Sequence, residues 1–81
     1  MYKDIESDLF KIFAKVFELT DKSINMNMSQ QNLESWDSLN HILLIVEIEK
    51  RFDMKFKVGE IGELDTVKKI FERVLYYSNK D

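Results

Sequence analysis

A run of apolar residues between Leu39 and Phe52 constrains the fold of this 81-residue chain more than any other feature. Apolar side chains recur there at spacings of three and four, the period of an α-helix, and no strand-like alternation competes with this pattern. On a helical wheel they form two roughly opposite faces: His41, Leu44, Ile45, Ile48 and Phe52 on one, and Leu39, Ile42, Leu43 and Val46 on the other. Because so small a domain can hardly surround a helix, we expect the first face to pack in the core and the second to serve in part for binding.

Two other segments show the same helical period. Apolar residues recur every three or four positions within residues 4–19 and again after Asp65, which is the expected N-cap of the last helix. Residues 59–64 are expected to form one short helical turn, and the polar residues 78–81 are expected to fray. The pattern predicts an all-α fold, a small bundle of three longer helices with a short helix before the last, in a single domain that covers residues 1–81.

Two connections join these helices. Residues 20–35 are rich in Asn, Gln and Ser, and a connection of this length inside a small domain is often functional. Its order must come from side-chain hydrogen bonds and from four apolar anchors, Ile24, Met26, Met28 and Leu33. Residues 53–58 form the second connection, in which Phe56 and Val58 are expected to point inward.

The composition excludes several classes of site. The chain has no cysteine, so it has no disulfide and no thiolate ligand for zinc, and its single histidine cannot build a metal cluster alone. The N-terminal residues alternate charged and apolar side chains, unlike a signal peptide, and no run is long enough to span a bilayer. We therefore expect a cytoplasmic protein without membrane insertion.

The charge is unevenly distributed along the chain. A net charge of −3 argues against nucleic-acid binding, which requires a basic face. No lysine or arginine lies between Lys22 and Lys50, whereas Glu34, Asp37, Glu47 and Glu49 in that stretch are acidic. We expect these carboxylates to steer a basic partner toward this part of the molecule.

The junction Trp36-Asp37-Ser38-Leu39 lies where the polar connection becomes the apolar helix. Asp37 or Ser38 is a good N-cap. A catalytic triad of Ser38 with His41 as base and Asp37 as orienting acid is disfavoured, because all three lie on one short segment and no second segment provides an oxyanion hole. We expect no enzymatic activity, and we expect His41 to be a partly buried core residue whose ring bonds nearby backbone.

The whole arrangement resembles the acyl carrier protein family, across essentially the full chain. The resemblance rests on Asp-Ser-Leu opening an apolar helix, on the Glu-Ile-Glu-Lys-Arg-Phe that ends it, and on a last helix opened by Asp-Thr-Val. It implies that Ser38 receives 4′-phosphopantetheine from coenzyme A, attached by a Mg²⁺-dependent phosphopantetheinyl transferase, with Asp37 and Leu39 as recognition neighbours. The terminal thiol of this arm would hold acyl groups as thioesters.

The resemblance also assigns further roles. It implies a monomer that docks on the transferase and on acyl-transferring, ligating or condensing enzymes through the helix after the serine. Its partner-binding residues would be Trp36, Leu43, Val46, Glu47 and Glu49, alongside Leu39. Ile42, Val46 and Ile61 would be the residues that line an acyl pocket between the helices, and ordinary packing is the competing interpretation for each.

Some residues depart from the common pattern of fatty-acid carriers. Asn40 and Leu43 stand where carboxylates are common, and Trp36 stands where a small residue is common. Trp-Asp-Ser-Leu looks more like stand-alone carriers of specialised pathways, such as polyketide-like or surface-glycan acylation. Peptidyl carriers usually have Gly-Gly before the serine and D-alanyl carriers usually have Asp-Ser-Met, so both are disfavoured. The alternative from another class is a helical interaction module in which Ser38 is only a helix cap.

Overall fold

The computed structural model describes residues 2–78, and the side chains of residues 4–78. Within this range the elements of regular secondary structure are helices, joined by connections. They are α1 (Tyr2–Phe17), a short 3₁₀ helix η1 (Asp21–Ser23), α2 (Ser38–Phe52), α3 (Val58–Ile61) and α4 (Val67–Ser78). The prediction of an all-α fold with a short helix before the last is confirmed. Residues 79–81, for which fraying was expected, lie outside the described residues, and Ser78 is the last residue of α4.

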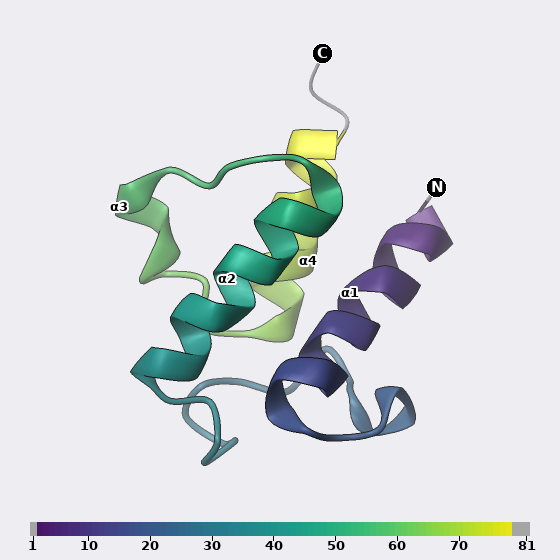
Figure 1. The fold of residues 1–81 in the computed structure, drawn as a ribbon, viewed down its shortest axis with the longest axis vertical. Coiled ribbons are helices and arrows are strands. Elements are labelled where there is room, and N and C mark those ends of the chain that lie inside the picture. Colours follow the sequence, from purple (N-terminus) through teal and green to yellow (C-terminus); the bar gives the residue numbers. More distant parts are fainter. Residues whose placement is uncertain (1, 79–81) are drawn as a thin grey trace.

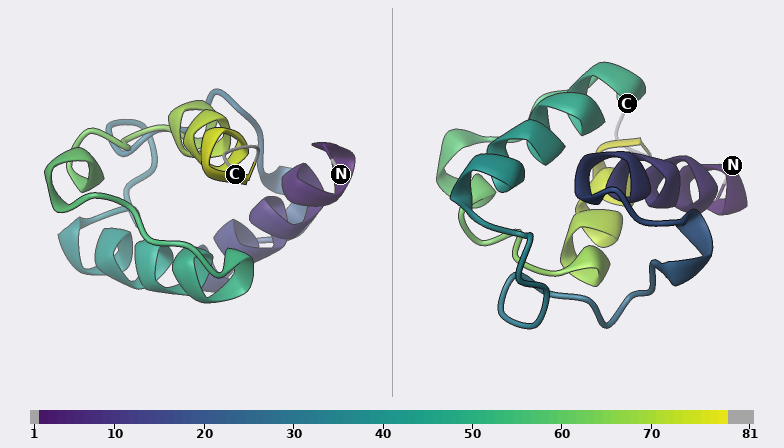
Figure 2. Two further views of the ribbon diagram at one scale, coloured as in Figure 1. Left: turned by 90° about the horizontal axis from the view of Figure 1, so that it is seen from above. Right: turned by 60° about the horizontal axis from the view of Figure 1, so that its bottom comes forward.

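The three longer helices pack around one core. α1 contacts both α2 and α4, and it runs in the opposite direction to them (Figure 1). α3 lies on the side of α2 that faces away from α1, as two further views show (Figure 2). α2 is therefore flanked by α1 on one side and by α3 on the other.

α2 separates its two apolar faces as the sequence predicts. His41, Leu44, Ile45 and Ile48 are buried in the core, and Phe52 at the end of the helix is half-buried. The opposite face is open to solvent, with exposed fractions of 69% for Leu39, 52% for Ile42, 48% for Leu43 and 44% for Val46. One helix thus supplies both the centre of the core and a row of exposed apolar side chains.

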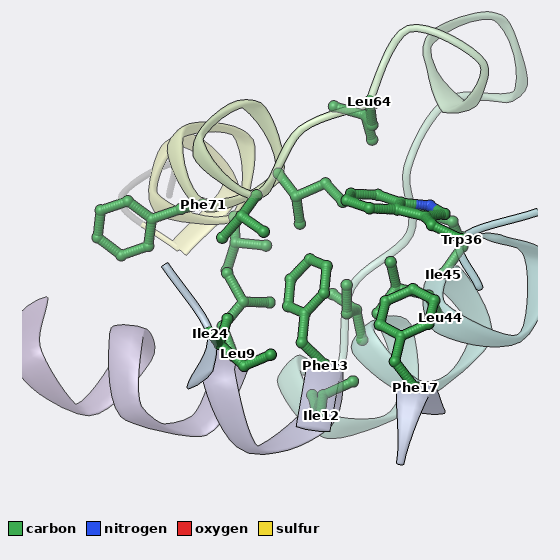
Figure 3. Close-up of a cluster of buried hydrophobic side chains, with 14 of the residues drawn as sticks. Leu9, Ile12, Phe13, Phe17, Ile24, Trp36, Leu44, Ile45, Leu64 and Phe71 are labelled. Atoms are coloured by element: carbon green, nitrogen blue, oxygen red, sulfur yellow. The ribbon is translucent and has the colours of Figure 1, made fainter. Parts of the chain in front are cut away.

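Trp36 is the largest side chain of the core, although it belongs to the connection before α2. Its exposed fraction is 1%, and its ring centroid lies 5.5 Å from that of Phe13 and 5.5 Å from that of Phe17, both in α1. Figure 3 shows the indole among these rings and the side chains of α2. The expectation that Trp36 contacts a partner is wrong, because a side chain so completely enclosed offers no surface to another protein.

The long connection is ordered by backbone hydrogen bonds that the sequence did not reveal. The Gln30 amide donates to the Asp65 carbonyl at 2.8 Å, and the Val67 amide donates to the Met28 carbonyl at 3.0 Å. These bonds form an isolated antiparallel bridge between the connection and the start of α4. The four expected anchors also reach the core: Ile24 is buried, and Met26, Met28 and Leu33 pack against it.

Two details near α3 differ from expectation. Phe56 is buried, but Val58 is 89% exposed, because it begins α3 and points away from the bundle. The cap of α4 is Thr66 instead of Asp65: the Thr66 hydroxyl oxygen accepts from the Lys69 amide at 3.0 Å. The carboxylate of Asp65 is bonded to the Lys69 ammonium instead, also at 3.0 Å.

Adjacent leucines on α2 test the assignment of its two faces. Leu44 is 0% exposed and Leu43 is 48% exposed, so the same substitution meets two environments. We expect Leu44→Ala to lower the free energy of unfolding by about 2–5 kcal/mol, out of a total of about 4–12 kcal/mol for a domain of this size. Leu43→Ala should change it by less than about 1 kcal/mol. Urea unfolding followed by Trp36 fluorescence measures both, and equal losses would contradict the assignment.

Candidate functional site

Ser38 is the first residue of α2, and its side chain is exposed. The residue before it caps the helix: the Asp37 backbone is extended, and its Oδ1 accepts from the Asn40 amide at 2.8 Å. Asp37 thereby satisfies one of the first amides of the helix, which have no acceptor within it. In the described part of the chain no hydrogen bond engages the Ser38 hydroxyl. Of the two expected caps, Asp37 is the correct one, and Ser38 is left to face solvent.

The three residues before Ser38 are held by the first turn of α2. The side-chain amide of Asn40 donates from Nδ2 to the Ser35 carbonyl at 2.7 Å. The Trp36 indole donates from Nε1 to Nδ1 of His41 at 2.9 Å. Together with the cap formed by Asp37, these bonds fix the segment that leads into the helix.

His41 is buried, with an exposed fraction of 6%, and both of its ring nitrogens are engaged. Since an indole N–H can only donate, Nδ1 must accept and Nε2 must carry the ring proton. Nε2 then donates to the Ile61 carbonyl of α3 at 2.8 Å. The prediction of a core histidine bonded to backbone is confirmed. The ring has no lone pair left to take a proton from Ser38, so it cannot serve as the base of a triad.

The exposed Ser38 hydroxyl is a suitable place for a covalently attached phosphodiester. The N-terminus of an α-helix has unpaired amides and the positive end of the helix dipole, both of which favour a phosphate. The hydroxyl lies outside the core, so an attached group would require no rearrangement of the packing. The residues present therefore fit a phosphodiester-linked arm at Ser38.

The carboxylates expected to bind partners are engaged within the protein. Glu47 accepts from Lys15 at 3.3 Å and lies 4.0 Å from the Lys50 ammonium. Glu49 accepts from the Phe56 amide at 3.0 Å. Leu43 and Val46, by contrast, are exposed as expected. The outer side of α2 therefore presents mainly apolar surface.

The three residues expected to line an acyl pocket lie in different surroundings. Ile42 and Val46 are on the exposed face of α2, and Val46 borders an open surface hollow together with Lys50 and Met54. Ile61 is half-buried and packs against the core. A pocket that these residues share stays a prediction for the acylated protein.

Sequence reasoning missed a polar cluster that ties α3 to α4. Glu60 accepts from the Lys57 amide at 2.7 Å and from the Tyr77 hydroxyl at 2.5 Å, and it pairs with Nε of Arg73 at 3.0 Å. Burial raises the pKa of Glu60, but the hydrogen bonds from Tyr77 and Lys57 and the charge of Arg73 outweigh it, so the pKa is lowered. The hydrogen bond that Tyr77 donates to Glu60 raises the pKa of Tyr77. With the bond from His41 to Ile61, α3 is attached to both of its neighbours.

The sequence of the chain is similar to those of known carrier proteins. No protein-family model matches the chain. It is 35% identical over 78 residues to the D-alanyl carrier protein of Streptococcus sanguinis, covering 94% of this chain and 98% of that protein. The D-alanyl carrier protein of Streptococcus mutans matches at 35% over the same shares, and that of Streptococcus gordonii at 33%. The chain belongs to the acyl carrier protein family.

The fold agrees with this assignment. A solved structure from Mycobacterium tuberculosis, described as an acyl carrier protein, superimposes with a TM-score of 0.81 and covers 90% of this carrier and 97% of its own chain. At 23% identity this likeness concerns the fold alone. No described helix of the carrier is long and apolar enough to cross a membrane. The argument against a D-alanyl carrier, which rested on leucine instead of methionine at position 39, is at odds with the relatives found.

The charge of Glu60 gives a pH-dependent test of how α3 is held. Because its pKa is below the ordinary 4.5, the charged form stabilises the fold above that pH, and this contribution is lost as pH falls through the lowered value. Glu60→Gln keeps the shape and an acceptor oxygen but removes the charge that faces Arg73. We expect the wild type to be more stable than Glu60→Gln at pH 7, and the difference to shrink below pH 4.5. Urea unfolding across pH measures it; a difference that persists unchanged at pH 3 would contradict this role.

Proposed function

We propose that this carrier holds acyl intermediates on a 4′-phosphopantetheine arm attached to Ser38. The observation that supports it most directly is an exposed serine hydroxyl without a hydrogen bond, placed at the N-terminus of α2 by a cap that another residue provides. In the modification the Ser38 oxygen displaces 3′,5′-ADP from the phosphorus of coenzyme A and loses its proton. When attached, the arm supplies the thiol on which acyl groups form thioesters.

In this proposal the carrier presents Ser38 and the attached arm to partner enzymes and does not itself catalyse a reaction. The ring nitrogens of His41, the nearest candidate base, are both bonded elsewhere. The chemistry is therefore assigned to its partners, a Mg²⁺-dependent phosphopantetheinyl transferase and acyl-transferring, ligating or condensing enzymes. The carrier acts with them as a monomer in the cytoplasm.

The acyl group belongs to a specialised acylation pathway in this proposal. Asn40 and Leu43 stand where fatty-acid carriers commonly have carboxylates. The relatives with which the carrier shares 33–35% of its residues are named D-alanyl carrier proteins. D-Alanine is therefore the first acyl group to look for on the thiol, by intact mass of the carrier purified from its native host.

Intact mass also tests the modification itself. The carrier is incubated with coenzyme A, Mg²⁺ and a broad-specificity transferase, and we expect the mass of one phosphopantetheine to be added. Ser38→Ala should abolish the addition and retain the helical circular dichroism, because Asp37 is the helix cap. Ser35→Ala is the matched control, since Ser35 is also exposed and contributes only its carbonyl.

Two results would contradict the modification. If the wild type gained no mass, the better description would be a helical interaction module in which Ser38 is not modified. If Ser38→Ala lost its helical signal, the role of Ser38 would be mainly structural.

We further propose that partners dock on the exposed apolar face of α2, formed by Leu39, Ile42, Leu43 and Val46. Counted from Leu39, these residues occupy positions i, i+3, i+4 and i+7, as the anchors of a helix that lies in an apolar groove do. None of the carboxylates expected to steer basic partners, Asp37, Glu47 and Glu49, belongs to this face. Glu47 is paired with the Lys15 ammonium, whereas Asp37 and Glu49 accept from backbone amides and keep their charge. Contact with this face is therefore apolar in the main.

The salt dependence of modification separates the two kinds of docking. We expect Leu43→Ser to lower kcat/KM for transfer to Ser38 by about tenfold or more, through KM, because burial of a leucine contributes about 1.5–3 kcal/mol. Raising the salt concentration should leave the wild-type value almost unchanged, since only charge steering is screened. Leu19→Ser, at an exposed leucine beyond the end of α1, is the control. A steep fall with salt and no effect of Leu43→Ser would favour acidic steering instead.

A further inference from the structure

Two consecutive residues in the first turn of α2 reach back to the segment that precedes Ser38. Asn40 binds the Ser35 carbonyl through its side chain at 2.7 Å, and its backbone amide binds the Asp37 carboxylate at 2.8 Å. His41 binds the indole of Trp36 at 2.9 Å. Each of the three residues before the serine therefore has a partner one turn farther along the chain. We call these bonds of Asn40 and His41 the back-clamp.

The hydrogen bond to the Ser35 carbonyl requires the side-chain amide of Asn40. Its Nδ2 is the donor, and a carbonyl oxygen is the acceptor. A carboxylate at position 40 would have no N–H to donate, and its charge would repel the Ser35 carbonyl. The departure of position 40 from the acidic pattern of fatty-acid carriers thus has a local cause in this structure.

His41 adds a second bond of fixed direction. Only the neutral ring with its proton on Nε2 can accept from Trp36 and donate to the Ile61 carbonyl at the same time. Both side chains are enclosed, with exposed fractions of 1% for Trp36 and 6% for His41, so water cannot easily replace these bonds. The back-clamp is therefore continuous with the core and, through Ile61, with α3.

We propose that Asn40 and His41 are positioning residues for the modification of Ser38. They hold residues 35–37 in one conformation, and this fixes the direction in which the Ser38 hydroxyl points away from the helix. Neither side chain belongs to the exposed apolar face of α2, so a change in either should act on the orientation of the hydroxyl and leave docking intact. The inference rests on the modification proposed above.

Steady-state kinetics of phosphopantetheine transfer tests this role. Asn40→Ala removes the donor, and Asn40→Asp replaces it by a carboxylate of the same shape. We expect both to lower kcat by about ten- to a hundredfold, the scale on which a small misplacement of a reacting group acts, with KM within about threefold of the wild type. A carboxylate at position 40 that left kcat unchanged or raised it would overturn the proposal.

A matched pair at position 41 distinguishes positioning from simple packing. His41→Phe keeps a ring in the core but neither accepts nor donates, whereas His41→Gln has one acceptor and one donor for the same two partners. We expect kcat to fall in His41→Phe and to recover at least in part in His41→Gln. Equal kcat in both variants, or a lowered midpoint of unfolding with unchanged kcat, would assign His41 to stability alone and overturn the proposal.

The single histidine and the single tryptophan allow the back-clamp to be seen without any modification. Long-range ¹H–¹⁵N NMR of the unmodified carrier should show the His41 proton on Nε2. Trp36→Phe should keep the proton there, because the Ile61 carbonyl can only accept, and should shift the Nδ1 resonance, which loses its donor. If the wild type gained no phosphopantetheine while this tautomer was present, the proposed function would fail and the clamp would remain as architecture only. If the wild type were modified and the Asn40 variants matched it, the positioning role alone would fail.

Discussion

The burial of Trp36 is the interaction on which the rest of this structure depends. The indole lies against Phe13 and Phe17 of α1, so the end of a long polar connection is drawn into the core immediately before α2 begins. Its N–H then requires an acceptor, which His41 provides, and this sets the rotation of α2. With His41 turned inward, Leu39 and Leu43 are turned outward. The core, the exposed serine and the exposed apolar face of α2 are consequences of the same placement.

The periodic features of the fold were predictable, and the features that depend on meetings between segments were not. Helical spacing is encoded within a few residues, so both faces of α2 follow from the order of its side chains. Trp36 stands in a connection, where no period tells inside from outside. Val58 was expected to point inward because it lies two residues after Phe56, as alternating anchors do. Asp65 and Thr66 each have a side-chain oxygen that can cap a helix, so the sequence does not choose between them. The Glu60 cluster joins residues from two helices whose packing the sequence does not reveal.

The candidate site was predictable for a different reason. Asp37, Ser38 and Leu39 stand together where a loop becomes a helix, so the sequence predicts a capped helix start there. The attachment role of Ser38 comes from the family resemblance and stays a prediction. The identity of the acyl group was not encoded there. Leu39 is 69% exposed, so the fold places little restriction on it and its exchange with methionine discriminates poorly between carriers. Likeness along the whole chain carries more weight than one residue of a short motif.

The two attachments of α3 have a consequence for local stability. A helix of four residues has too few internal hydrogen bonds to persist alone, so the order of α3 comes from Glu60 on one side and from the Ile61 carbonyl on the other. Both attachments are polar, and of the four residues of α3 only Ile61 packs against the core, whereas the long helices are joined by many buried apolar residues. We therefore expect α3 to open at a lower free energy than the three long helices, separately from global unfolding. We therefore expect local opening of this domain on the flank of α2 that lies farthest from α1.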